Sequence, residues 1–367
     1  MRTEASRRRC LTVAALAALA CASLPATGPA KAAGGSLPYP KSAAVTSFNL
    51  DWNSLQRLAP GSDNWATTWA GDGLVYATWG DGNGFSNTRV SLGFARLSGA
   101  SARAVHGSNL PGTAPKGKSY GVFALGKTLY AWISPASNAF NYREARLYAA
   151  PLGTNAWRHA SWAFTKDDPA HLILPTFLQA GQDYGQGGAY VYVYAPRYAP
   201  VQANRLSLQR TPGRGGEIAL LRAARGSDLM RRDSWQFFAG LDQNGQPRWS
   251  GDARDVKPVI TDQNGVGWTV SAIYQPALKR YLVATEHGAS FGSHLTLLES
   301  PTVYGPWSTV AYTTLTDPKR RIDQTAFHFN LLPNSLSGNK FTLAFTGTGR
   351  SDALLLIDGT FGAKRTD

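Results

Sequence analysis

"GSDNWATTWAGDGLVYATWGDGNG", residues 61–84, holds an apolar run, a glycine-containing turn and a second run in which aromatic and β-branched residues alternate with smaller ones. That pattern predicts a β-hairpin whose tip lies at Asp72-Gly73. Asp63 and Asp81 stand at the two outer ends of the hairpin, whereas residues typical of a turn occupy its tip. The question that follows is why a protein would place acids at both ends of one hairpin.

The hairpin pattern recurs along the chain. Comparable runs start at Trp65, Tyr120, Phe177, Trp268 and Phe329, at spacings of 55, 57, 91 and 61 residues. Strand-rich units that repeat at a period near 60 residues are typical of propeller blades. The outer strands of the blades are predicted in four further segments: residues 89–97, 148–162, 216–224 and 297–312. We therefore predict an all-β fold, a five-bladed β-propeller.

The two ends of the repeating region each lack a partner. Residues 43–52 precede the first hairpin, and residues 353–361 follow the last one without a fourth strand. Pairing between these two segments would close the ring and remove its exposed edges, so we expect the N-terminal strand to complete the fifth blade. The longest spacing contains residues 226–241, where we expect the one short helix.

The hairpin geometry answers the opening question. Because the first two strands of a blade run antiparallel, the start of one and the end of the next lie on the same face of the ring. That face is predicted to collect the catalytic candidates Asp63, Asp81, Glu286 and Asp323. The predicted substrate-binding residues are Asn64, Trp65, Lys118, Tyr120, Trp268, His287 and Arg350.

Carboxylates that face each other across a funnel suit glycoside hydrolysis, in which one acid protonates the leaving oxygen and the other activates water or attacks the sugar. We expect Asp63 to be the base or nucleophile, held ionised by Asn64 and Lys118. Glu286 is the expected proton donor, its pKa raised by partial burial and neighbouring acids. The tryptophans Trp65, Trp69, Trp79 and Trp268 could stack on sugar rings or pack between blades.

Two other functions fit the same residues. A polysaccharide lyase would use His287 or Tyr120 as the base and Arg350 to neutralise a uronate. A non-catalytic glycan-binding propeller would need no acid/base pair. The products distinguish the three, because a lyase yields an unsaturated sugar, a hydrolase yields new reducing ends and a lectin yields neither.

The N-terminus reads as an export signal over residues 1–32. A basic segment with Arg7-Arg8-Arg9 precedes the apolar run "LTVAALAALACASL", and Ala30-Lys31-Ala32 fits a cleavage site. The arginines resemble a twin-arginine signal, although an ordinary secretory signal fits too. We expect residues 33–42 to form a linker, residues 43–367 to form the propeller, and the protein to be secreted or periplasmic.

The cysteine content and the net charge limit which ligands and partners fit the protein. Both cysteines, Cys10 and Cys21, lie in the export signal, so the mature chain would carry no thiol. The formal charge of +14 falls to about +10 without the signal, which favours an anionic polysaccharide or adhesion to anionic envelope polymers. No motif indicates a cofactor, a metal, nucleic acid or a membrane span, and we expect a monomer.

Several motifs together resemble a family. They are "GSDNWATTWAGDGLVYATWGDGNGF" (61–85), "RVSLGFARL" (89–97), "KSYGVF" (118–123), "FFAGLD" (237–242), "NGVGWTVSAIYQPALKRYLVATEH" (264–287) and "LAFTGTGRSDALLL" (343–356). From Phe48 to Phe361 the chain resembles a bacterial family of exported proteins classified as a domain of unknown function. The resemblance implies a five-bladed β-propeller similar to furanosidase-type glycoside hydrolases, and some members of the family are endo-D-arabinanases.

Overall fold

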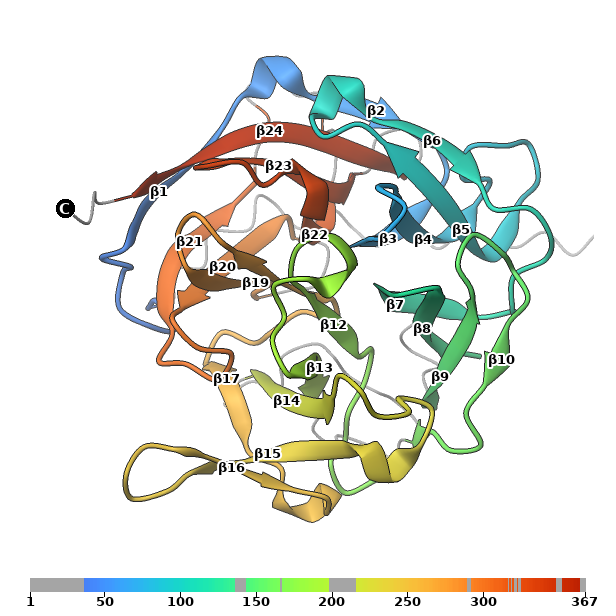
Figure 1. The fold of residues 1–367 in the computed structure, drawn as a ribbon. Coiled ribbons are helices and arrows are strands. Elements are labelled where there is room, and N and C mark those ends of the chain that lie inside the picture. Colours follow the sequence, from blue (N-terminus) through green and yellow to red (C-terminus); the bar gives the residue numbers. More distant parts are fainter. Residues whose placement is uncertain are drawn as a thin grey trace, which may run out of the picture. The chain divides into compact units, whose positions relative to one another are not determined.

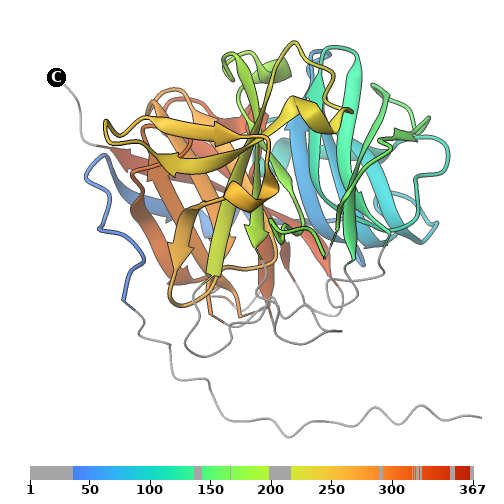
Figure 2. The same ribbon diagram turned by 90° about the horizontal axis from the view of Figure 1, so that it is seen from below.

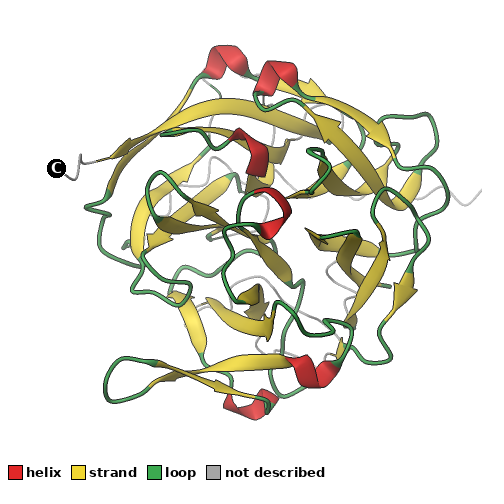
Figure 3. Cartoon of the chain, viewed as in Figure 1, coloured by secondary structure: helices red, strands yellow, loops and turns green. Residues whose placement is uncertain are grey.

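The computed structural model describes residues 36–135, 143–165, 167–197, 216–288, 292–315, 317, 319, 322, 325–347 and 352–363. All of them belong to the compact unit Gly35–Asp367. The described residues form β-strands joined by turns and short 3₁₀ turns, and they include no α-helix (Figure 3). The prediction of an all-β fold is therefore confirmed. No helix among these residues is long and apolar enough to cross a membrane.

Backbone pairing divides the strands into antiparallel sets (Figure 1). Set 1 contains β3 (Asp63–Trp69), β4 (Val75–Gly82), β5 (Val90–Ser98) and β6 (His106–Asn109). Set 2 contains β7 (Lys118–Leu125), β8 (Thr128–Ser134), β9 (Glu144–Pro151) and β10 (Arg158–His159), with β11 (Phe164–Thr165) also pairing with β9.

The next two sets belong to one sheet. Set 3 contains β12 (Thr176–Gln179), β13 (Tyr190–Arg197), β14 (Gly216–Ala224), β15 (Trp235–Leu241) and β16 (Pro247–Ser250), and β17 (Pro258–Asp262) pairs with β14. Set 4 contains β18 (Val270–Gln275), β19 (Arg280–Glu286), β20 (His294–Ser300) and β21 (Ser308–Thr314). Parallel pairing of β12 with β18 joins the two sets.

Set 5 brings the two ends of the unit together. It contains β22 (Ala326–Leu331), β23 (Lys340–Gly347), β24 (Ala353–Ala363) and β1 (Val45–Leu50), with β2 (Gln56–Leu58) also on β24. β1 runs antiparallel to β24, with Val45 opposite Ala363 and Leu50 opposite Gly359.

The first strands of the five sets surround a common centre. A narrow space there is lined by all of them, for example by Ala66 of β3, Val122 of β7, Phe177 of β12, Ala272 of β18 and Leu331 of β22. Figure 2, turned by 90°, shows these hairpins edge-on, with their strands running in roughly one direction. The start of each first strand and the end of its partner therefore lie at the same end of this bundle, which we call the mouth end. The opposite end, where the hairpins turn, is the tip end.

The 3₁₀ turns occupy the connections. They are η1 (Trp52–Ser54), η2 (Ala102–Ala104), η4 (Gln182–Tyr184), η5 (Arg232–Ser234), η6 (Ala253–Asp255) and η7 (Pro333–Ser335). The helix expected within residues 226–241 is wrong, because this segment forms η5 and then β15, whose sequence WQFFAGL is rich in aromatic residues. η4 lies over the middle of the strands in Figure 1, and Gln182 Nε2 donates to the Gly71 carbonyl at 3.1 Å.

The segment before β1 is packed against sets 3 and 4. Tyr39 Oη accepts a hydrogen bond from Thr261 N at 2.8 Å, and Thr309 Oγ1 donates to the Tyr39 carbonyl at 2.8 Å. Ser42 Oγ donates to Glu299 at 2.7 Å. Residues that we expected to be part of a linker therefore make specific contacts with the strands.

Candidate active site

Two residues at the mouth end of set 1 adopt left-handed backbone conformations. Asn64 has φ of 55° and Asp81 has φ of 49°. The pairing of β3 with β4 shifts register between Asp63 and Ala66. On β4, Asp81 lies between Gly80 and Gly82, which pair with Leu92 and Val90 of β5. Asparagine and aspartate tolerate this conformation better than most residues. A bulge changes the direction in which side chains project, so it aims the acids differently from a regular strand.

Asp63 is the more enclosed of the two acids. Its Oδ1 is buried and accepts no hydrogen bond within the described part of the chain. Burial raises the pKa of Asp63 to about 6, and the charges of Asp81 and Asp352 raise it as well, against the lowering effects of Lys118 and of a hydrogen bond from Asn64. Asn64 and Lys118 favour the ionised form of Asp63, in the direction expected, but burial outweighs them and the pKa is raised.

Lys118 connects the two acids. It is the first residue of β7, its side chain is 4% exposed, and its ammonium forms an ion pair with Asp81, whose side chain is 50% exposed. Gly80 lies between the groups: a Cβ added there would collide with Asp63 Oδ1 and lie 3.3 Å from Lys118 Nζ. The sequence therefore brings a buried acid, an exposed acid and a buried cation together, and a glycine leaves them room.

Asp352 is a neighbour that was not among the predicted site residues. It precedes β24, burial raises its pKa, and it acts electrostatically on Asp63. Arg57 of β2 lowers the pKa of Asp352, whereas Asp81 raises it. The signal for Asp352 is topological: Ala353 pairs with Gly347, so the third strand of this set also starts at the mouth end. The predicted residues came from the ends of first and second strands alone.

Aromatic residues from three sets meet next to this cluster. Tyr120 lies two residues after Lys118, and its ring centroid is 5.8 Å from that of Trp268 and 6.1 Å from that of His328. Trp268 also lies 6.4 Å from Phe327. Tyr120 is 3% exposed and Trp268 is 7% exposed, so both rings present little surface to a ligand.

Glu286 is enclosed next to Gly267. Its side chain is 1% exposed, and neither carboxyl oxygen is hydrogen-bonded within the described residues. A Cβ added to Gly267 would lie 2.8 Å from Oε2, so a glycine again leaves space for an acid. Burial raises the pKa of Glu286 to about 8. The expected neighbouring acids do not contribute, because burial is the one cause of this shift.

His287 belongs to a separate polar network. Its ring stacks on Tyr312 with centroids 3.6 Å apart, and its Nδ1 lies 2.8 Å from Thr296 Oγ1. Tyr312 donates to Asp262 at 3.0 Å and accepts from Asn264 at 2.8 Å. Burial and the neighbouring His294 lower the pKa of His287 to about 4, so its imidazole is neutral at pH 7.

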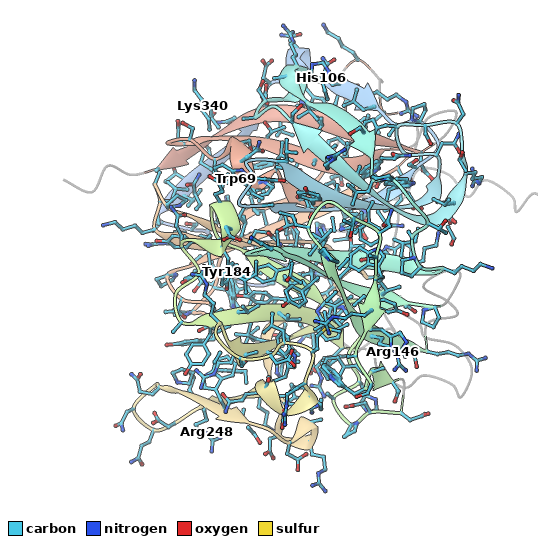
Figure 4. All side chains as sticks on the ribbon, turned by 45° about the vertical axis from the view of Figure 1, so that its right-hand side comes forward. Trp69, His106, Arg146, Tyr184, Arg248 and Lys340 are labelled. Carbon is cyan, nitrogen blue, oxygen red and sulfur yellow. The ribbon has the colours of Figure 1, made fainter. Side chains whose placement is uncertain are left out.

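Two of the three tryptophans of set 1, Trp65 and Trp79, pack inside the molecule. Trp65 is 0% exposed and stacks on Trp79, with centroids 5.7 Å apart, in a cluster that reaches β24. Trp69 lies at the tip end, where its Nε1 donates to the Gly73 carbonyl at 3.2 Å (Figure 4). These positions correct the expectation of a substrate-binding Trp65, because a buried ring offers no face to a sugar.

The remaining candidates are placed as follows. Asp323 and Arg350 lie outside the described residues. His328, which has φ of 51° and is fully buried, has neither ring nitrogen hydrogen-bonded in the described part of the chain, and burial lowers its pKa to about 3. Among the described residues, no three His, Cys, Asp or Glu side chains are grouped so that they could hold a metal ion.

Comparison with known proteins identifies the class of fold. No protein-family model matches the chain, and no curated protein matches it. Among solved structures, the chain resembles a hydrolase structure from Bacteroides ovatus at 12% identity and a TM-score of 0.51, covering 82% of this chain and 87% of that one.

Two further structures are similar to the same degree. One is a β-xylosidase, at 10% identity and a TM-score of 0.51, covering 84% of this chain and 98% of that one. The other is a GH43 β-xylosidase/α-arabinofuranosidase from a compost microbial metagenome, at 13% identity and a TM-score of 0.50, covering 87% and 96%. At these identities the likeness concerns the fold, which is propeller-like and all-β, of the kind found in glycoside hydrolases.

Proposed function

We propose that the protein is a glycoside hydrolase whose acid/base pair is Asp63 and Asp81. The observation that carries this proposal is the cluster at the mouth end of set 1, where a buried acid with a raised pKa lies beside an exposed acid that is paired with Lys118. Glycoside hydrolysis needs one carboxyl group that donates a proton and a second that activates water or attacks the sugar. Different environments allow two neighbouring carboxyl groups to take these two roles.

The two environments assign the roles. Asp63, with a pKa of about 6, can hold a proton near neutral pH and donate it to the leaving oxygen. Asp81, half-exposed and ion-paired, would act on water or on the sugar. This reverses the role first expected of Asp63, since burial favours its protonated form. Glu286 is less suited to donate a proton to a substrate, because its carboxyl group is enclosed.

We also propose that each antiparallel set is one blade, so that the ring has five blades and β1 closes it against β24. The pairing of Val45 with Ala363 and the space lined by all five first strands support this view. The substrate that we propose is a cell-wall or environmental polysaccharide of the arabinan or arabinogalactan type. The protein would meet it after export to the periplasm or the medium, where residues 1–32 would be removed.

Product analysis tests the proposal. Purified protein incubated with arabinan or arabinogalactan should release new reducing ends without near-ultraviolet absorbance. Absorbance from an unsaturated sugar on uronate polymers would instead indicate the lyase, for which His287 is a buried neutral base. If no product forms on any of these polymers while binding is measurable, the non-catalytic propeller is the better description.

A further inference from the structure

An arginine at the tip end of sets 3 and 4 is held between two aromatic rings. The guanidinium carbon of Arg222, on β14, lies 4.1 Å from the ring centroid of Tyr190 and 4.1 Å from that of Trp249. Its Nε donates to Gln236 Oε1 at 3.0 Å. Two cation–π contacts and one hydrogen bond thus fix both the position and the orientation of the group.

The outer edge of that guanidinium is free. Among the residues that the structure describes, neither Nη1 nor Nη2 of Arg222 takes part in a hydrogen bond or an ion pair. The Nε1 donor of Trp249 is buried and is also without an acceptor there. An arginine that is rigid but unpaired presents two parallel N–H donors, which match the two oxygens of a carboxylate.

Half-buried tyrosines surround the same place. Tyr192 lies 6.2 Å from Tyr190 and 6.1 Å from Trp249, measured between ring centroids. Tyr281 lies 5.0 Å from Tyr274, and both Tyr281 and Tyr304 are close enough to Tyr192 to affect it electrostatically. None of these five hydroxyl groups makes a hydrogen bond to a described residue. We call Arg222, Trp249 and these five tyrosines the tyrosine–arginine surface.

This surface is separate from the candidate active site. Tyr281 stands near the start of β19, whereas Glu286 ends that strand, and Tyr274 lies towards the far end of β18 from Trp268. Tyr190 starts β13 directly after the turn that contains η4. The surface therefore lies at the tip end, opposite Asp63 and Asp81.

We infer that the tyrosine–arginine surface is a second carbohydrate-binding site that takes acidic sugars, with Arg222 gripping the carboxylate of a uronate residue. Aromatic rings supply flat apolar faces for sugar rings, free phenols bond to their hydroxyl groups, and the fixed guanidinium selects an anion. The positive formal charge of the chain favours the same ligand class. The inference does not rest on the proposed function, because binding here requires no catalysis.

Calorimetric titration with a galacturonate oligosaccharide tests the site, in an Asp63→Asn background that suppresses cleavage during the titration. We expect Arg222→Lys to weaken binding about tenfold or more, because lysine keeps the charge but loses the paired donors. Tyr281→Phe, which removes one hydroxyl and leaves the ring, should weaken binding by a smaller factor. Melting temperatures of all variants would confirm that each is folded.

Arg248→Gln is the matched control. Arg248 is exposed on β16 next to Trp249 (Figure 4), but consecutive strand residues point to opposite faces, so it does not belong to the surface. This variant should bind as tightly as the unmodified background. Absence of binding, equal losses for Arg222→Lys and Arg248→Gln, or equally tight binding of a neutral arabino-oligosaccharide would each overturn the inference.

Discussion

Asp63 is the residue on which the catalytic proposal depends. Replacing it by asparagine keeps the shape and removes the proton, so we expect turnover to fall by about 10²-fold or more, the usual contribution of a positioned acid or base. The melting temperature should change little, since no described residue needs Oδ1 as an acceptor. Rate and melting temperature measured on one preparation check both expectations.

Asp183→Asn provides the control for that variant. Asp183 lies at the tip end, where its Oδ1 accepts a hydrogen bond from Gly126 N at 2.7 Å, and asparagine can still accept this bond. Its turnover should match that of the unmodified protein. If Asp63→Asn retained near-normal turnover, Asp63 would have no place in the mechanism, and Asp81 with Asp323 would become the acids to test.

The pH dependence of turnover tests the role of Asp63. A proton donor with a pKa of about 6 loses activity as the pH rises through that value. Lys118 lowers this pKa, so Lys118→Gln should move the alkaline limb of the profile to higher pH. A profile that instead rises with pH near 6 would show that Asp63 acts as the base.

The buried carboxyl group of Glu286 leads to a prediction about the pH dependence of stability rather than of turnover. Its pKa is 4.5 when unfolded and about 8 in the folded protein, so the folded state binds the proton more tightly. The contribution of this group to the free energy of unfolding has its full value below pH 4.5 and is lost as the pH rises through 8. Glu286→Gln should therefore flatten the alkaline decline of melting temperature and leave turnover within a few-fold.

The acid side of the same profile is an internal control. His328 and His287 have lowered pKa values of about 3 and about 4, so protons bind them more readily in the unfolded chain. Stability should fall as the pH drops below about 6.5, in the variant as in the unmodified protein. An unchanged alkaline decline in Glu286→Gln would mean that Glu286 is not buried in its protonated form.

The sequence predicted the site residues unevenly. Asp63, Asp81 and Lys118 could be placed at one end of the strands because antiparallel hairpins fix where strand ends lie. Trp65 could not be assigned to the core, since alternation along β3 does not reveal which face meets the neighbouring strands. The burial of Glu286 could not be predicted either, because it depends on the close approach of Gly267, which precedes β18 and lies 19 residues away in the sequence.

At the scale of elements, the hairpins were predictable and their connections were not. Alternating aromatic and β-branched residues identify each pair of inner strands, such as β7 with β8. The short helix expected near residue 230 is wrong because an amphipathic stretch of that length is compatible with a turn and a strand. The packing of Tyr39 against sets 3 and 4 involves contacts distant in sequence, which no local pattern reports.

Strand β1 gives an element-scale prediction. Phe48 stacks on Phe341, with centroids 5.0 Å apart, and lies 6.1 Å from Phe361. Phe48→Ala should cost about 1–3 kcal/mol of the free energy of unfolding. Removal of residues 33–50 should leave one edge of β24 unpaired over residues 359–363 and cause aggregation. Denaturant titration and light scattering measure the two effects.

A chain lacking residues 33–35 alone is the control for the deletion, and it should behave as the mature protein does. A stable, monomeric 51–367 fragment would contradict the closing role of β1.

At the scale of the whole molecule, the candidate active site and the tyrosine–arginine surface lie at opposite ends of the strands. If both operate, an acidic polymer can be held at one end while a chain is cleaved at the other. Arg222→Gln should then raise KM on a long uronate-containing polysaccharide and leave kcat/KM on a short neutral oligosaccharide unchanged. A fall on both substrates would indicate a general loss of structure.

The pairing of β1 with β24 also sets the order of events during biosynthesis. β1 is the first strand of the unit to leave the ribosome and β24 is the last, with more than 300 residues between them. The first strand must therefore wait, with one edge unsatisfied, until synthesis of the chain is complete. Nascent protein should be recognised by chaperones and cleaved by proteases throughout elongation, and it should gain resistance late, after the C-terminus is released.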